Sequence, residues 1–227
     1  MKPIKYICFL FLVTGVCKAQ TYQLSGDVKG LKNDSLLILS QKGKTTSIKK
    51  IKVVAGKFAF GDTLKEPYFV QVFKLKNGAN ETEGKLTEFL AEAGTITITG
   101  PSPRFEDVQV AGSVADQVLK KYLKEDAKIV ANWEQLKVQY DQYVAQKDTL
   151  SRKKVANELN DMLFKERIPL LKQYVAQYKN NMLGALLPNF CLLKDLLSKA
   201  DYLEMYNMLT VQFKQTDYAK STFEKSK

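Results

Sequence analysis

Short runs of alternating apolar and polar residues characterise the first half of the chain. Apolar positions alternate through residues 22–28, and residues 95–99 read strictly Thr-Ile-Thr-Ile-Thr. Five further short apolar segments lie between these two and are bounded by turn residues: 35–40, 45–54, 58–60, 68–73 and 86–91. Seven or eight short strands at a spacing of roughly ten residues predict an antiparallel β-sandwich or open barrel.

The second half of the chain has a helical period. After Pro101-Ser102-Pro103, we expect a last strand at 105–110 and then an N-cap at Ser113, a residue type that satisfies free backbone N–H groups. Apolar residues then recur in steps of three or four, and Pro169 is expected to kink or divide a long helical stretch. The expected helical segments are 114–140, 150–178, 183–198 around Pro188, 200–213 and a short terminal turn at 217–225.

These patterns predict a segregated α+β protein. Its expected parts are an N-terminal β-sandwich domain at residues 20–112 and a C-terminal helical domain of four to five helices at residues 113–227. Low-complexity linkers and a repeat period are missing from the sequence.

Residues 1–19 have the order of a secretory signal peptide. Two lysines precede an apolar run at 6–16 that is shorter than the roughly 20 residues needed to cross a bilayer. Small residues stand at the two cleavage positions, so we expect cleavage after Ala19 and an exported, periplasmic or envelope-associated protein. In the less favoured alternative Cys17 is lipidated, but the preceding Val16 is not small. No later segment is apolar enough to be a transmembrane helix.

Charge argues against a nucleic-acid partner. Residues 1–19 contain three lysines and no acid, so the remainder has 32 basic and 24 acidic residues, a net charge of +8. The basic residues are interspersed with acids, as at 120–126, which is typical of a solvated helix face. Lysine greatly outnumbers arginine, and export would remove the nucleic acid. We therefore expect no nucleic-acid binding.

Two counts exclude common catalytic chemistries. The chain contains no histidine, which excludes histidine acid–base catalysis, Ser-His-Asp and Cys-His systems, and histidine-containing metal sites. Beyond residue 19, Cys191 is the only cysteine, so neither an intrachain disulfide nor a CxxC motif can form. Its apolar setting predicts a buried, inert thiol. We expect no enzyme and no catalytic, cofactor-binding or metal-ligating residues.

One short motif suggests a phosphate-binding loop. Gly43-Lys44-Thr45 has the right residue types, but the signature also needs a glycine five residues earlier, where Ile38 stands. The residues that follow are strand-like, whereas a phosphate loop precedes a helix. A hairpin turn is therefore the favoured interpretation.

Two carboxylates at a suitable spacing can perform glycosidase chemistry. One segment carries four: Glu81, Glu83, Glu88 and Glu92. Turn signals at 77–78 and 84 indicate a solvated loop around the first two. Further acids, Glu125, Asp126 and Asp141, fall on the polar side of a helix and are interpreted as surface charge.

Aromatic residues recur at helical spacing in the second half: Tyr122, Trp133, Tyr140, Tyr143, Tyr174, Tyr178, Tyr202 and Tyr206. They could line a ligand groove between helices. Since aromatic residues at this spacing more often fill a core, we expect core positions.

The order of several short landmarks in the first half resembles the DUF4369 family. The landmarks are Leu24-Ser25-Gly26-Asp27-Val28, residues 56–60, Glu66-Pro67-Tyr68, residues 89–100 and Val110-Ala111-Gly112-Ser113. This family is found at the N-terminus of exported thioredoxin-like proteins of Bacteroidetes. The resemblance implies a sandwich and helices that precede a thioredoxin-fold domain, whose CxxC carries the redox chemistry. No counterpart of those cysteines exists here, so neither the redox activity nor any functional residue is carried over.

The favoured function is therefore a non-enzymatic, exported binding or accessory module of the envelope. A separately encoded thioredoxin-fold protein is the expected kind of partner. One alternative is a truncated relic of a thioredoxin-like oxidoreductase with a structural role only. Less favoured is a carbohydrate-active enzyme that uses a carboxylate pair.

Overall fold

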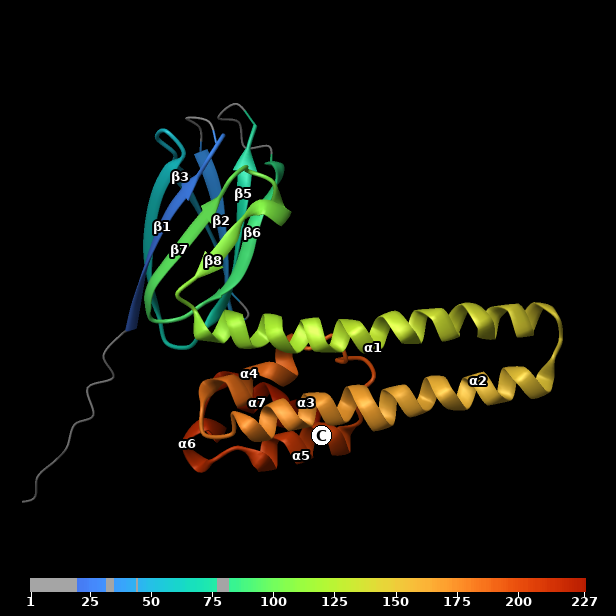
Figure 1. The fold of residues 1–227 in the computed structure, drawn as a ribbon. Helices are drawn as coiled ribbons and strands as arrows, with labels where there is room; N and C mark the ends of the chain where they lie inside the picture. The colour runs from blue at the N-terminus through green and yellow to red at the C-terminus, as the bar shows by residue number, and fades with distance from the viewer. Residues whose placement is uncertain (1–19, 32–34, 44, 77–81) are drawn as a thin grey trace, which may run out of the picture.

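The chain folds into a sheet lobe followed by a helical lobe (Figure 1). The structure, a computed structural model, describes residues 20–31, 35–43, 45–76 and 82–227. The segregation of strands and helices confirms the α+β class predicted from the sequence. The interpretations of residues 1–19 as a signal peptide, with cleavage after Ala19 or lipidation of Cys17, and of Asn77-Gly78 as a turn, lie outside the described residues.

Two sheets face each other in the sheet lobe as a sandwich. Within the described residues, the first sheet has the order β4 (Lys57–Leu64), β1 (Gln20–Val28), β7 (Gly94–Gly100), β8 (Gln109–Ala111). The second has the order β3 (Thr45–Lys52), β2 (Ser35–Lys42), β5 (Tyr68–Leu75), β6 (Thr82–Ala91). The strand expected at 105–110 is mostly replaced by a single 3₁₀ turn, Phe105–Asp107, so that only the short β8 remains.

Strand pairing is antiparallel except between β1 and β7, which run parallel with Leu24 opposite Ile96. This pair differs from the wholly antiparallel arrangement expected from the sequence. A parallel neighbour needs a long connection instead of a hairpin turn. Here the connection is the chain from β2 to β6, which builds the whole second sheet before β7 returns beside β1.

Alternate strand positions fill the space between the sheets. In β1 the buried side chains include Tyr22, Leu24 and Val28, while the residues between them are mostly exposed. They pack with apolar residues of the facing sheet, such as Val70 and Phe89. Burial of one such side chain stabilises the fold by about 1.5–3 kcal/mol. The edge strand β3 is mostly exposed and rich in lysine, which discourages pairing with a further strand.

Two landmark glycines are required by close packing. A Cβ on Gly26 would lie 2.0 Å from the ring of Phe58 on the neighbouring strand β4. Gly112 has a φ of +94° and its hydrogen faces the Thr95 carbonyl oxygen, which a Cβ would approach to 2.0 Å. Only glycine has the conformational freedom and the small volume for that position. It turns the chain from β8 into the first helix.

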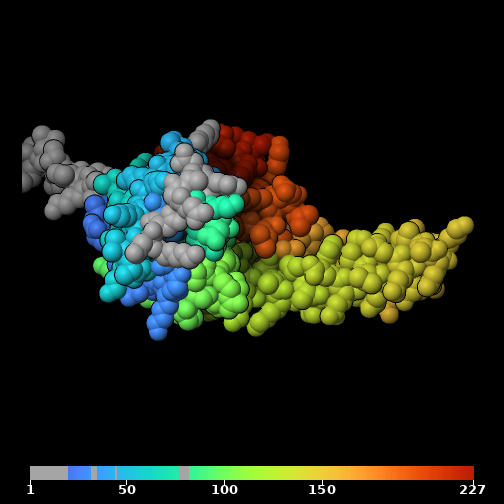
Figure 2. Space-filling view, turned by 90° about the horizontal axis from the view of Figure 1, so that it is seen from above, coloured from blue at the N-terminus to red at the C-terminus, as the bar shows by residue number. Residues whose placement is uncertain are grey.

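The first two helices form a projecting arm. α1 (Val114–Ala145) begins at Ser113, whose hydroxyl oxygen accepts from the Asp116 N–H at 3.0 Å, which confirms the predicted N-cap. At 1.5 Å per residue α1 is roughly 48 Å long. α2 (Thr149–Asp161) packs back along it, and the outer part of the pair extends beyond the rest of the molecule (Figures 1 and 2).

The chain from α2 to α3 (Ile168–Gln177) passes through one π-helical turn, Met162–Arg167. Pro169 lies in the first turn of α3, so the stretch expected to kink or divide there stays helical and changes helix type just before the proline. A proline inside a helix lacks an N–H and clashes with the carbonyl four residues earlier. The wider π turn immediately before α3 accommodates it.

The remaining helices are shorter than expected. α4 (Met182–Phe190) ends soon after Pro188, because Cys191 is extended with a ψ of 157°. The segment expected as one helix at 200–213 forms α5 (Lys199–Met208) and α6 (Val211–Lys214). Between them Leu209 is extended and the Thr210 N–H donates to the Lys179 carbonyl. α7 (Asp217–Lys225) follows as predicted.

One surface assignment from the sequence is wrong. Asp126 is fully buried and receives two hydrogen bonds from Arg167, Nε to Oδ1 at 2.7 Å and Nη2 to Oδ2 at 2.8 Å. The pKa of Arg167 is raised, chiefly by its hydrogen bond to this carboxylate. Arg167 belongs to the π turn, 41 residues further along the chain, so local charge pattern could not reveal the pair. Asp141, by contrast, is exposed and pairs only with Lys137, as expected of surface charge.

Across the described ranges, none of the helices combines the length and the apolar character needed to span a bilayer.

Candidate ligand-binding groove

A groove of about 1060 Å³ lies between the two lobes. This size is at the upper end of the roughly 300–1000 Å³ typical of ligand pockets. Its sheet-lobe wall comes from the start of β1, the β2–β3 hairpin and the β4–β5 turn, and its helical wall comes from α4, the loop after it and α7. We call it the interlobe groove and define it by its lining: Gln20, Gln41, Lys42, Gly43, Thr63, Leu64, Lys65, Glu66, Pro67, Tyr68, Asn189, Phe190, Lys194, Asp217, Tyr218, Ser221 and Lys225.

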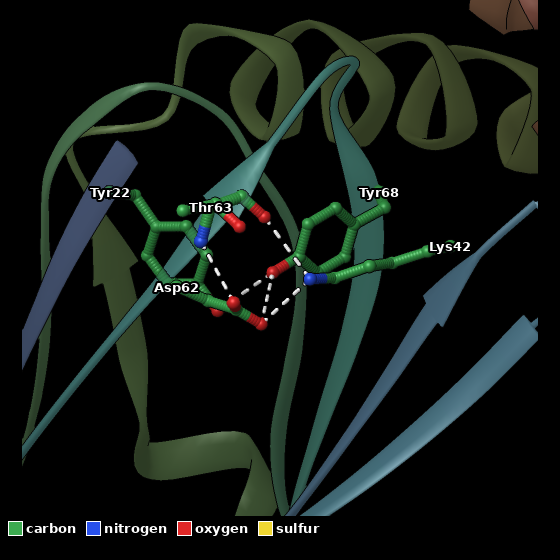
Figure 3. Close-up of polar contacts among 5 residues, drawn as sticks. All are labelled: Tyr22, Lys42, Asp62, Thr63 and Tyr68. Atoms are coloured by element: carbon green, nitrogen blue, oxygen red, sulfur yellow. Dashed lines mark hydrogen bonds and ion pairs between the residues drawn. The ribbon is translucent and has the colours of Figure 1, made fainter. Parts of the chain in front are cut away.

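Polar side chains from both sheets meet at the sheet-lobe wall (Figure 3). Asp62 of β4 accepts from Lys42 Nζ of β2 at 2.8 Å and from the backbone N–H of Thr63 at 2.8 Å. Its second contact across the sandwich is the hydroxyl of Tyr68 on β5, which donates at 3.2 Å. The hydroxyls of Tyr68 and Tyr22 lie 3.3 Å apart. This Asp62 cluster therefore links β1 and β4 of one sheet to β2 and β5 of the other.

The groups of this cluster are held in fixed protonation states. Burial raises the pKa of Tyr22 to about 12, and burial, together with hydrogen bonding to Tyr22, raises that of Tyr68 further. Burial alone would raise the pKa of Asp62, but the hydrogen bonds from Lys42 and the Thr63 N–H outweigh it, so the pKa is lowered. Both phenols stay protonated and the carboxylate stays charged near neutral pH. Lys42, Thr63 and Tyr68 of the cluster line the groove, whereas Asp62, outside the lining, holds all three by hydrogen bonds. The phenols and the carboxylate titrate away from neutral pH, so they are not poised for proton transfer there.

The helical wall is equally well fixed. Asn189 donates from Nδ2 to the carbonyls of Ala185 and Tyr218, each at 3.1 Å, and to Thr222 Oγ1 at 3.2 Å. The rings of Phe190 and Tyr218 meet edge to face at 5.6 Å between centroids. Since both rings line the groove, they provide an apolar strip beside the polar groups.

The β4–β5 turn fastens the two walls to each other. Glu66 Oε1 accepts from the backbone N–H of Asp217 at 2.9 Å, where the free N–H groups of α7 begin. The Tyr218 hydroxyl donates to the Pro67 carbonyl at 2.6 Å, and Lys65 pairs with Asp217 at 3.3 Å. Glu66, Pro67 and Tyr68 are one of the sequence landmarks, and the structure places all three at the groove.

A second junction lies at the start of α1. Ser113 Oγ donates to the Leu90 carbonyl at 2.7 Å, and Asp116 Oδ1 accepts from the Leu90 N–H at 3.0 Å. Glu92 accepts from the backbone N–H groups of Val114 and Ala115. Two junctions on different strands hold the helical lobe in one orientation, so the groove is a preformed feature of the fold.

The carboxylates considered for glycosidase chemistry do not converge. Glu81 lies outside the described residues, and Glu83 is exposed. Glu88 accepts from Lys85 Nζ at 2.5 Å and from Gln71 Nε2 at 3.1 Å, while Glu92 caps α1. Each described acid of this segment except Glu83 has a structural partner. In the part of the chain that the structure describes, no three acids or cysteines gather closely enough to hold a metal ion.

Two further candidates from the sequence are the Gly43-Lys44-Thr45 motif and Cys191. Lys42 pairs with Thr45 across β2 and β3, and Gly43 has a φ of +60°, which confirms a tight hairpin; Lys44 lies outside the described residues. Cys191 is buried, as predicted, and burial raises the pKa of its thiol.

The prediction that the aromatic residues of the second half occupy core positions is confirmed for three of them. Tyr122, Tyr174 and Tyr202 are buried in the helical core. Trp133, Tyr140 and Tyr143 lie half-buried on the arm instead. The aromatic residues that do line the groove, Tyr68, Phe190 and Tyr218, were not recognised from the sequence as site residues. Tyr68 belonged to a landmark segment, which was the only available signal.

Comparison with known families agrees with this architecture. Residues 22–119 match the model of DUF4369, described as a domain of unknown function. The matched residues comprise most of the sheet lobe and the first turns of α1, and this part of the chain is similar to the DUF4369 family. The match confirms the resemblance found from the landmarks, and it extends past Ser113 into α1, where the second junction lies. No curated protein matches the chain.

Proposed function

We propose that this protein is a non-enzymatic, exported accessory module of the envelope that binds another protein in the interlobe groove. The observation that carries the proposal is the groove itself, which both lobes build together and two junctions hold open. A preformed concave site with a few fixed polar groups and an apolar strip is typical of a binding site.

The chemistry of the groove supports binding over catalysis. Catalytic groups need a pKa near the working pH and a free side to face a substrate. The phenols of Tyr22 and Tyr68 have raised pKa values, and Asp62 is held by two hydrogen bonds from Lys42 and Thr63. Asn189 is likewise occupied by acceptors within the chain. These groups can orient a ligand, but they are not poised to transform one.

The proposed partner is a thioredoxin-fold protein encoded separately. The support is the DUF4369 match together with the sequence resemblance to exported thioredoxin-like proteins, in which such a domain follows the sandwich and helices. Export is supported by the signal-peptide pattern of residues 1–19. The alternative of a truncated relic with a structural role predicts that no partner depends on the groove.

A capture experiment with a blocked groove tests the proposal. Tagged protein lacking residues 1–19 is incubated with envelope extract of its own source, and retained proteins are identified by mass spectrometry. Ser221→Trp fills the groove from α7, whereas Gln212→Trp adds the same side chain on exposed α6, outside the lining. Thermal unfolding of both variants checks that each is folded.

The expected result is one thioredoxin-fold protein retained by the unchanged chain and by Gln212→Trp but lost with Ser221→Trp. Equal retention by all three proteins, or no thioredoxin-fold protein at all, would overturn the proposal. Hydrolase or reductase turnover by the purified protein would overturn its non-enzymatic part.

A further inference from the structure

The charged side chains of the interlobe groove are not all neutralised within the chain. Of its four lysines, Lys42 pairs with Asp62 at 2.8 Å and Lys65 pairs with Asp217 at 3.3 Å. The remaining acid of the lining, Glu66, accepts from the backbone at the start of α7. Both acids of the lining, Glu66 and Asp217, are therefore already engaged.

Two lysines of the helical wall remain, Lys194 after α4 and Lys225 at the end of α7. Over the described ranges, neither forms an ion pair with an acid. Both line the groove, and Tyr202 contacts each residue: its hydroxyl donates to the backbone carbonyl of Lys194 at 3.0 Å, and Lys225 Nζ lies 5.3 Å from the centre of its ring. Lys225 Nζ also contacts Asn189 Oδ1 at 3.3 Å. We call Lys194 and Lys225 the lysine pair.

Electrostatics favour an anion beside this pair. Although the Lys225 side chain is exposed, partial desolvation lowers its pKa, and the positive charge of Lys194 lowers it further. The acceptor that Lys225 Nζ contacts, Asn189 Oδ1, is neutral. An arriving carboxylate would offset two like charges of the same lining and form charge-assisted hydrogen bonds.

The surroundings indicate which anion fits. The Phe190 and Tyr218 rings lie in the same lining, so a ligand there contacts apolar surface as well as charge. The groove's volume of about 1060 Å³ is many times the roughly 30 Å³ that one water occupies in the liquid. A small inorganic anion would leave most of it filled with water. An extended peptide would fill it.

We infer that the lysine pair is a carboxylate-binding subsite for an aspartate or glutamate side chain in an acidic peptide segment of the groove's partner. The inference rests on the proposed function only in taking the interlobe groove as the binding site. The carboxylate specificity of the subsite does not depend on the fold of the partner.

The test uses a labelled hexaglutamate peptide as the probe, with hexaglutamine as the uncharged control. Binding is measured by fluorescence anisotropy on the chain lacking residues 1–19, at low and at moderate salt. The key variant is Lys194→Gln/Lys225→Gln. The matched control is Lys153→Gln/Lys154→Gln on exposed α2, which removes the same net charge far from the groove.

We expect hexaglutamate to bind more tightly than hexaglutamine and to weaken as salt screens the charges. The lysine-pair variant should bind hexaglutamate at least about tenfold more weakly. The α2 variant should change the affinity less than about twofold, because long-range attraction to net charge contributes less to affinity than direct contact between opposite charges. In a ¹³C-lysine NMR titration, bound hexaglutamate should raise the pKa of Lys225.

Equal weakening by both variants would overturn the subsite in favour of non-specific attraction to a basic protein. If inorganic phosphate displaces hexaglutamate completely at equal concentration, the ligand of the subsite is a small anion and the inference of a peptide ligand is overturned. Hexaglutamate binding with no thioredoxin-fold partner captured would leave the subsite standing and overturn only the proposed partner.

Discussion

Glu66 in the β4–β5 turn accepts a hydrogen bond from the backbone N–H of Asp217, the first residue of α7, at 2.9 Å across 151 residues of sequence. A carboxylate at a helix N-terminus satisfies a free donor and interacts favourably with the helix dipole. Because α7 forms part of one wall of the groove and the β4–β5 turn forms part of the other, this contact joins the walls together with the Tyr218–Pro67 and Lys65–Asp217 contacts. It gives the landmark Glu66-Pro67-Tyr68 a structural role.

The neighbouring contact predicts a moderate loss of stability. Tyr218→Phe removes the hydroxyl that donates to the Pro67 carbonyl at 2.6 Å. A lost hydrogen bond of this kind costs about 0.5–1.5 kcal/mol of the free energy of unfolding. Urea unfolding followed by circular dichroism measures it. Tyr143→Phe on the arm serves as the control and should change stability by less than about 0.5 kcal/mol. Equal effects of both changes would contradict the role of the junction.

The buried ion pair predicts the largest effect of a charge change. Asp126→Ala leaves Arg167 buried without its partner, and breaking a buried pair in this way costs about 3–5 kcal/mol. Asp141→Ala removes an exposed pair with Lys137 on the same helix and should cost less than about 1 kcal/mol. Thermal and urea unfolding of the two variants provide the comparison. A stable Asp126→Ala protein would mean that the arginine has an alternative partner.

We expect Gly112→Ala to destabilise the protein by a steric clash in addition to the cost of its positive φ. In Gly112→Ala the new methyl group would lie 2.0 Å from the Thr95 carbonyl oxygen at a φ of +94°, so β7 and the start of α1 must separate. Gly43→Ala also requires a positive φ, but nothing lies within 4 Å of its Cβ. The hairpin change should cost about 1–2 kcal/mol, as expected for a left-handed alanine. Gly112→Ala should cost clearly more, measured by the same unfolding experiments.

The Asp62 cluster predicts a contribution to acid stability. The pKa of Asp62 is lower in the folded protein than its ordinary value, because its hydrogen bonds from Lys42 and Thr63 outweigh its burial. Its contribution is therefore present above the unfolded pKa of about 3.9 and is lost as pH falls through the folded pKa. Asp62→Asn should flatten the stability curve below about pH 4. Urea midpoints from pH 2.5 to 7 measure this. An unchanged acid slope would contradict the assignment.

We expect the thiol of Cys191 to react only after the protein unfolds. It is 2 % exposed, and burial raises its pKa, so both access and thiolate formation are suppressed. A thiol-reactive dye at pH 8 should label the native chain lacking residues 1–19 slowly and label it fully in denaturant. Fast labelling of the native protein would show that the segment after α4 opens.

Much of the fold could be predicted because its causes are local. Alternation in β1 and β7, the change to helical period after Gly112, the cap at Ser113 and the helical irregularity at Pro169 each depend on residues within a turn or two of one another. The ends of the later helices were harder to predict from the sequence. The extended Leu209 between α5 and α6 is held by the packing of Thr210 onto the Lys179 carbonyl, which lies in another loop.

Sequence patterns alone were enough for the class of the fold, for the resemblance of the first half to DUF4369, and for the chemistries excluded by a chain without histidine and with a single cysteine beyond residue 19. Only the tertiary structure decided the parallel pairing of β1 with β7, the burial of Asp126 against Arg167, and the interlobe groove with its lysine pair. The physical reason is distance along the chain. Periodicity and capping act between neighbours, whereas a groove built from residue 20 to residue 225 exists only after both lobes have folded and docked.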